Sequence, residues 1–309
     1  MCPSLCGGDR SLSRREVWVA WLRQAEERGP GMAEPRTYPH GVTCWIDTEQ
    51  PDLQAASLFY CALFGWALTE AAPPGASGSY LIASLDGHEV AAIGSTSARA
   101  AVWNTYVAVN DADATAAAVT AAGGTVVSAP SDARPAGRAA ICMDPAGAGF
   151  RLWQAGTRLG AQVANTPGAW NFSDLHTPDR DAAMAFYTPV FGWRAADLGQ
   201  GAGTMLQVPG YGDHLAATVD PGIYARQASA PPGFADVIGG LVLAGPGERA
   251  HWHVTFTVAD RDDSAATAER LGGTIVTSSD DVWTRNAMVR DPQGAEFTIS
   301  QFTPPDGDW

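Results

Sequence analysis

The sequence predicts an α+β protein built from four similar modules that are paired into two domains. The main observation is an internal repeat, because FYCALFGW at 59–66 returns 127 residues later as FYTPVFGW at 186–193. Two shorter motifs also repeat, GGTVV at 123–127 as GGTIV at 272–276, and DPAG at 144–147 as DPQG at 291–294. Since self-similarity at a fixed spacing indicates a duplicated structural unit, we expect equivalent elements in the two halves.

Each module is predicted to run strand, helix, strand, strand, strand. In the first module an alternating strand over 42–48 precedes a helix that starts at Pro51-Asp52 and ends at Gly65, because apolar residues recur on one helical stripe between these points. Strands follow at 66–69, 80–85 and 88–93. The second module has a strand at 102–109, a helix over about 113–122, and later strands near 125–127 and 150–154.

The third module mirrors the first, with a strand at 171–177 and a helix at 180–191, and the fourth mirrors the second. GDHLAA at 212–217 matches GHEVAA at 87–92, which predicts a strand that starts near His214. Regular patterning lapses at 156–168. We therefore divide the chain into an N-terminal extension over 1–36, a first domain over 37–160 and a second over 161–309. The extension is expected to be a short helix or an artefact of start-codon choice.

Composition excludes several classes of function. The 33 acidic and 19 basic residues give a net charge of −14, which argues against nucleic acid and anionic membranes as partners and favours cationic or neutral ligands. Every one of the basic residues is arginine, so a Schiff-base lysine and a phosphate-loop lysine are absent. Five scattered cysteines without a CxxC pair indicate neither a zinc knuckle nor a disulfide framework. Without a secretory signal pattern, we expect a cytoplasmic protein.

The repeated motifs, in this order, resemble the vicinal oxygen chelate superfamily, which includes glyoxalase I, extradiol dioxygenases and bleomycin-binding resistance proteins. The resemblance covers residues 37–303. More narrowly, WxD at 45–47, TxxPD at 48–52 and FGW are similar to two-domain actinobacterial proteins of hydroxylase-like or glyoxalase-like type, some of which tailor aromatic polyketides. The resemblance implies βαβββ modules whose mixed sheets curl pairwise into cups around a ligand. Because four modules complete two cups, either a monomer or a homodimer is expected.

The resemblance also implies where a metal would bind. Metal-using members place His or Gln on a first strand, seven residues before the aspartate that starts the helix, and Glu on a last strand. The matching positions in this chain are Trp45, Asn104, Phe172 and His253 on first strands, and Arg151 and Thr298 on last strands. Because one imidazole remains, we predict no metal and no cofactor. The same loss of ligands disfavours extradiol dioxygenase chemistry, which needs two His and one carboxylate on one iron.

Strand alternation then predicts what fills the cups, because residues two apart share a face. The candidate catalytic groups are Asp174, His176, His253 and Glu296, all in the second cup, where burial beside carboxylates suits acid–base catalysis. The candidate ligand-binding residues are Trp45, Asp47, Asn104, Tyr106, Arg151, Trp153, Phe172, Thr255, Thr298 and His214. We expect His251 to face away from His253. A structural role for any single histidine is the competing interpretation, and a register slip of one residue would turn it outward.

Three functions are compatible with these patterns. The first is a metal-independent enzyme that uses acid–base catalysis to cyclise, dehydrate or isomerise a hydrophobic aromatic or polycyclic, polyketide-like metabolite. The eleven tryptophans, several of them on predicted strands, favour a flat apolar ligand bound by stacking. The second is a protein that sequesters a drug or metabolite. The third is a metal-dependent glyoxalase or dioxygenase whose ligands lie outside the family positions.

Overall fold

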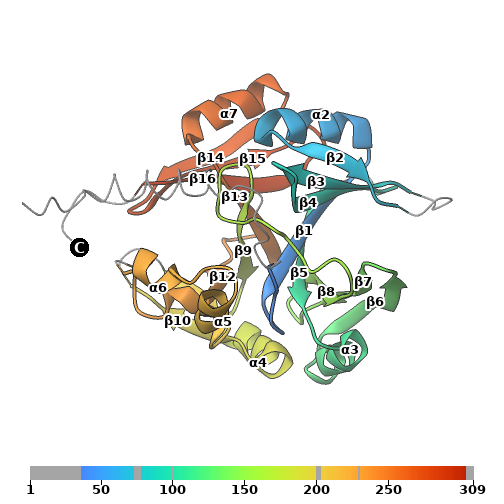
Figure 1. Ribbon diagram of the computed structural model, residues 1–309, viewed down its shortest axis with the longest axis vertical. Coiled ribbons are helices and arrows are strands. Elements are labelled where there is room, and N and C mark those ends of the chain that lie inside the picture. Colours follow the sequence, from blue (N-terminus) through green and yellow to red (C-terminus); the bar gives the residue numbers. More distant parts are fainter. Residues whose placement is uncertain (1–35, 73–77, 99, 200–202, 229, 304–309) are drawn as a thin grey trace, which may run out of the picture. The chain divides into compact units, whose positions relative to one another are not determined.

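The structure is a computed structural model that describes residues 36–72, 78–98, 100–199, 203–228 and 230–303 (Figure 1). Within these residues the strands form two eight-stranded mixed sheets, ordered β2-β3-β4-β1-β5-β8-β7-β6 and β10-β11-β12-β9-β13-β16-β15-β14. The predicted fold class is confirmed. In each sheet two modules join edge to edge through their antiparallel first strands.

The first sheet and its helices comprise β1 (Thr43–Gln50), α2 (Leu53–Phe64), β2 (Ala67–Glu70), β3 (Tyr80–Leu85), β4 (His88–Ser95), β5 (Val102–Ala108), α3 (Ala112–Ala121), β6 (Thr125–Ala133), β7 (Gly137–Met143) and β8 (Gly149–Ala155). The second comprises β9 (Trp170–Thr177), α4 (Arg180–Phe191), β10 (Arg194–Asp197), β11 (Thr204–Gln207), α5 (Tyr211–Ala217), α6 (Ile223–Arg226), the 3₁₀ helix η1 (Phe234–Asp236), β12 (Val237–Leu243), β13 (His251–Thr257), α7 (Arg261–Arg270), β14 (Thr274–Asp280), β15 (Thr284–Arg290) and β16 (Glu296–Phe302). No described helix is long and apolar enough to cross a membrane.

The four module helices begin in the same way. In each, an aspartate at the N-cap accepts a hydrogen bond from the backbone N–H three residues later, which satisfies one of the unpaired donors of the first turn. The caps are Asp52, Asp111, Asp179 and Asp260. Helices α2 and α4 both end at a glycine in the left-handed conformation, Gly65 with φ 75° and Gly192 with φ 74°. The FGW motif therefore contains a helix stop that favours glycine.

The repeated motifs contact each other across the two domains. The Tyr60 hydroxyl of the first FYxxxFGW motif donates to Asp291 of the second DPxG motif at 2.8 Å, and Tyr187 donates to Asp144 at 3.1 Å. Helix α2 accordingly lies beside α7, and α3 beside α4 (Figure 1). Each hydrophobic core contains residues of both eight-stranded sheets, and the first core also contains Trp45 and Tyr106 of the first cup.

One predicted strand of the third module is wrong. Residues 212–217 lie in helix α5, because Tyr211 and Leu215 are one helical turn apart and both are buried against the core. The strand that pairs in parallel with β9, as β4 pairs with β1, is β12. Its sequence VIGGLVL is a continuous apolar run, the pattern typical of a buried strand.

Candidate functional site

The first cup is centred on Asp47, which is 1% exposed on β1. Its Oδ2 accepts hydrogen bonds from the hydroxyls of Tyr106 at 2.5 Å and Tyr80 at 3.0 Å, and its Oδ1 accepts from the Asn104 amide at 2.8 Å. The Trp45 indole N–H donates to Tyr80 at 3.1 Å. The carboxylate is therefore surrounded by donors from two other strands of the same sheet, β5 and β3.

An ion pair closes this network on one side. Arg151 on β8 donates to the Tyr106 hydroxyl at 3.2 Å and forms an ion pair with Glu49. Trp153 packs edge-on against Tyr106, with ring centroids 6.4 Å apart, and donates its N–H to the Arg158 carbonyl at 2.9 Å. The predicted residues of the first cup thus lie together, and most of their polar atoms are used by one another.

Burial, and then the Asp47 charge, raises the pKa of Tyr80 and of Tyr106 well above the ordinary range. Both phenols therefore stay protonated and remain donors to the carboxylate at neutral pH. Because a catalytic acid or base needs to exchange its proton with a ligand, a group held in this way is suited to a structural role.

The second cup places Asp174 on β9 directly opposite His253 on β13. One oxygen of Asp174 accepts a hydrogen bond of 2.6 Å from the backbone N–H of Gly240, and burial raises the pKa of this carboxyl. A Cβ at Gly240 would lie 2.7 Å from the same oxygen, so a side chain at this position would push the carboxylate away from the backbone N–H. The other predicted wall residues, Phe172 and Thr255, face each other two residues further along the strands.

His253 occupies the one family ligand position that keeps an imidazole. It is 5% exposed, and its Nε2 lies 2.8 Å from the hydroxyl of Thr298 on β16. Burial, and then the nearby His176 and His251, lower its pKa to about 4. The imidazole is therefore neutral at pH 7 and has an unshared electron pair on one ring nitrogen.

Three further groups gather at the outer end of these strands. His176 Nδ1 lies 2.6 Å from the Glu248 carboxylate, and the His176 ring is 4.6 Å from that of His251 and 5.6 Å from that of His253. The prediction that His251 faces away from His253 is wrong, because residues two apart in a strand share a face and both rings lie beside His176.

Two other site predictions are corrected by the structure. Glu296 is exposed at the start of β16 and forms an ion pair of 2.6 Å with Arg290 on the neighbouring strand β15, so its charge is used there. His214 lies in helix α5, and its Nε2 is 3.1 Å from both the hydroxyl and the carbonyl oxygen of Thr37. This helical position follows from the wrongly predicted strand at 212–217.

The family metal positions do not fit a metal. In the first cup they hold an indole, an amide and a guanidinium, and in the second a phenyl ring, an imidazole and a hydroxyl that is bonded to that imidazole. Among the described residues, donor atoms of His176, Glu248 and His251 lie within 4.8 Å of one another, at the cup's outer end. Two imidazoles and a carboxylate are ligands that zinc, iron and nickel accept.

Sequence reasoning missed Tyr80, Glu49 and Glu248. Strand alternation could have identified Glu49, because it shares a strand face with Trp45 and Asp47. Tyr80 lies two strands from Asp47 in the sheet order, and Glu248 lies in the loop between β12 and β13. Since no periodicity governs a loop residue, its contact with His176 depends on the tertiary fold.

Comparisons with known proteins agree with the fold. The model of the glyoxalase-like domain family matches residues 44–153 and 170–300. CFP32, a candidate glyoxylase of Mycobacterium tuberculosis, is 35% identical over 280 residues, covering 88% of this chain and 99% of the relative. The anthracycline biosynthesis protein DnrV of Streptomyces peucetius is 34% identical over 280 residues, covering 85% of this chain and 94% of the relative.

Solved structures show the same fold at low identity. The Mn(II)-bound glyoxalase from Novosphingobium aromaticivorans superposes with a TM-score of 0.52 at 18% identity, covering 88% of this chain and 87% of that one. The 2,3-dioxygenase LapB from Pseudomonas sp. KL28 superposes with a TM-score of 0.55 at 13% identity, covering 87% of this chain and 96% of that one. At these identities the likeness concerns the fold, and chemistry has to be argued from this chain's own residues.

Proposed function

Because the chain belongs to the glyoxalase-like family of the vicinal oxygen chelate superfamily, we propose that it is an enzyme acting on a hydrophobic aromatic or polycyclic metabolite. The reaction is a proton transfer, as in a cyclisation, dehydration or isomerisation, and uses no metal at the family positions. The observation that carries the proposal is the second cup's pair of facing groups, Asp174 and His253, with His176 beside them.

His253 is the general base of this proposal. Its neutral imidazole can take a proton from a carbon next to a carbonyl group or from a hydroxyl group of the substrate, and Thr298 holds the ring in place through its Nε2. His176, with Glu248 on its Nδ1, is the partner that returns a proton at a second atom. The Glu248 carboxylate holds the His176 ring through Nδ1 and leaves Nε2 as the atom that can transfer a proton to the substrate.

The relatives and the cup walls support the proposed substrate class. The anthracycline biosynthesis protein DnrV aligns over 94% of its length, and anthracyclines are polycyclic aromatic molecules. Phe172 stands opposite Thr255 beside the catalytic pair, where a ring can contact a flat substrate. These points support an aromatic substrate without naming one compound.

The test is turnover of aromatic polyketides, followed by mass spectrometry with and without a chelator. We expect activity that persists with the chelator and falls in His253→Ala and His176→Ala. The control is His88→Ala, because His88 is exposed on the first domain. Full activity in both cup variants would overturn the residue assignment. A ligand that binds in stoichiometric amount and is recovered unchanged would instead identify a sequestering protein.

A second candidate function is metal-dependent catalysis. The close spacing of His176, Glu248 and His251 favours it, because these three groups can hold a divalent ion without any family position. Metal analysis of purified protein decides between the two. A bound stoichiometric metal that is lost in Glu248→Gln, together with activity that the chelator abolishes, would favour the metal-dependent function.

A further inference from the structure

A cavity of about 90 Å³ lies between the start of the first domain and helices α5 and α6 of the second. Its walls include Arg36, Tyr38, Trp170, Tyr211 and Gln227, with apolar side chains around them. The volume is several times what one water molecule needs, and below the roughly 150 Å³ of an enclosed cavity that holds benzene. Because the cavity is partly open to solvent, it suits one end of a larger molecule.

The polar groups of this cavity are incompletely paired. Three of the seven buried side-chain atoms that lack a hydrogen-bond partner in the described chain belong to its walls: Arg36 Nε, Trp170 Nε1 and Gln227 Oε1. Buried donors and acceptors without partners are uncommon in folded proteins, because each one has lost its hydrogen bonds to water without replacing them. Their gathering around one cavity indicates a site that is completed by another molecule.

The arginine is the most unusual of the three. Its Nη2 donates to the Tyr211 hydroxyl at 3.1 Å, and its guanidinium carbon lies 5.3 Å from the centroid of the Tyr38 ring. Both contacts are with neutral groups. Among the described residues no Asp or Glu forms an ion pair with it, although a guanidinium keeps its charge at every pH of interest.

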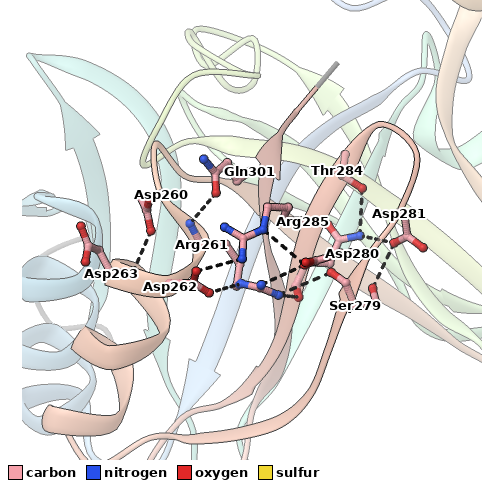
Figure 2. A network of polar contacts seen from close by, with 11 residues as sticks. Asp260, Arg261, Asp262, Asp263, Ser279, Asp280, Asp281, Thr284, Arg285 and Gln301 are labelled. Atoms are coloured by element: carbon pink, nitrogen blue, oxygen red, sulfur yellow. Dashed lines mark hydrogen bonds and ion pairs between the residues drawn. The ribbon is translucent and has the colours of Figure 1, made fainter. Parts of the chain in front are cut away.

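Another buried arginine, Arg261, forms ion pairs with two carboxylates. Figure 2 shows Arg261, which is 6% exposed and donates to Asp262 at 2.6 Å, to Asp280 at 2.9 Å and to the Asn286 carbonyl at 2.7 Å. There two carboxylates and a carbonyl satisfy the cation. Arg36 has the same charge and a buried Nε, and among the described residues it lacks such a carboxylate.

We infer that this cavity binds the carboxylate of an aromatic small molecule. The carboxylate pairs with Arg36, whose Nε–H is a free donor, and it can accept a second hydrogen bond from the Trp170 indole N–H. The ring of the ligand lies against apolar wall residues such as Phe172 and Phe234. A single guanidinium and a cavity of this size match a monoanion better than a phosphate dianion.

Binding of a carboxylate at Arg36 is independent of the proposed catalysis, because it uses neither His176 nor His253. It also differs from what overall charge predicts. A net charge of −14 favours cationic or neutral ligands at long range, whereas within a cavity the nearest charge decides, since solvent screens it less. Phe172 is common to the cavity and to the second cup, because it lines the cavity and lies two residues before Asp174 on β9.

The test is binding of benzoate, measured by calorimetry or ligand-observed NMR in the millimolar range expected of so small a ligand. Benzamide, which has the same shape without the charge, is the control ligand. We expect benzoate to bind about tenfold to a hundredfold more tightly than benzamide, since a hydrogen bond to a charged group contributes about 1.5–3 kcal/mol. Equal binding of both ligands, or no benzoate binding, would overturn the inference and leave a water-filled cavity.

Three variants locate the site. Arg36→Met removes the charge, and Gln227→Glu places a competing carboxylate in the same cavity, so both should lose the preference for benzoate. Arg134→Met is the control, because that arginine is 83% exposed on the first domain. If Arg36→Met unfolds, the Gln227→Glu protein still decides. Unchanged benzoate binding in Gln227→Glu, or its loss in Arg134→Met, would contradict this location.

Discussion

The two cups are built from equivalent strands, yet they use their carboxylates in opposite ways. Asp47 in the first cup accepts three hydrogen bonds from side chains of its own sheet. Asp174 in the second accepts one from a backbone amide and stands opposite a neutral imidazole. Groups that satisfy one another hold a fold together, whereas groups with spare hydrogen-bonding capacity can act on a ligand. On this difference we base the proposal that the first cup is structural and the second cup is reactive.

The largest expected effect concerns activity. His253→Ala should lower kcat/KM by roughly 100-fold to 10,000-fold, the usual contribution of a general base. Asn104→Ala, on the corresponding first strand of the first cup, should change it little. Steady-state kinetics on an aromatic polyketide measure both. A larger loss in the Asn104 variant would place the chemistry in the first cup.

The next effect concerns stability. Asp47→Ala leaves the hydroxyls of Tyr80 and Tyr106 and the Asn104 amide without their acceptor, so the free energy of unfolding should fall by about 3 kcal/mol. Asp174→Ala removes one backbone contact and should cost about 1 kcal/mol. Denaturant titration compares them. A costlier loss at Asp174 would reverse the roles assigned to the two cups.

A smaller effect tests the contacts that the cups share. Tyr60→Phe and Tyr187→Phe each remove a hydroxyl that bonds an aspartate of the other domain, and each should lower the free energy of unfolding by about 1–2 kcal/mol. The two losses should be similar, because the contacts are equivalent in the repeat. A strong loss in one variant and none in the other would show that the domains are joined asymmetrically.

The smallest effect is one of pH. Burial raises the pKa of Asp144 above its ordinary value of 3.8, so folding favours the protonated carboxyl. Its contribution to stability is present below the unfolded-state pKa and is lost as the pH rises through the raised value. Wild type should therefore lose stability relative to Asp144→Asn as the pH rises from about 3 to about 7, as measured by denaturant titration. A relative gain by wild type would contradict this sign.

Repeats and spacing predict most of this fold and part of the site. The four capping aspartates fixed the count that places Trp45, Asn104, Phe172 and His253 on facing strands, and the structure brings these strands together. The repeat misleads at helix α5, because residues 212–217 resemble residues 87–92 of the first module but form a helix that buries Tyr211 and Leu215. Spacing along the chain also does not reveal which side chains form ion pairs. It predicts Glu296 beside the histidines of the second cup, whereas Glu296 forms an ion pair with Arg290. Arg36 was placed in the extension, yet it bonds Tyr211 of the second domain.

The central claim is that the second cup is the reactive one, and locating a bound ligand tests it most directly. A crystal structure of the protein with an aromatic polyketide should show the ligand between Phe172 and His176, with a polar atom within hydrogen-bonding distance of His253. A ligand in the first cup, against Trp45 and Tyr106 and with the Asp47 network opened, would contradict the account.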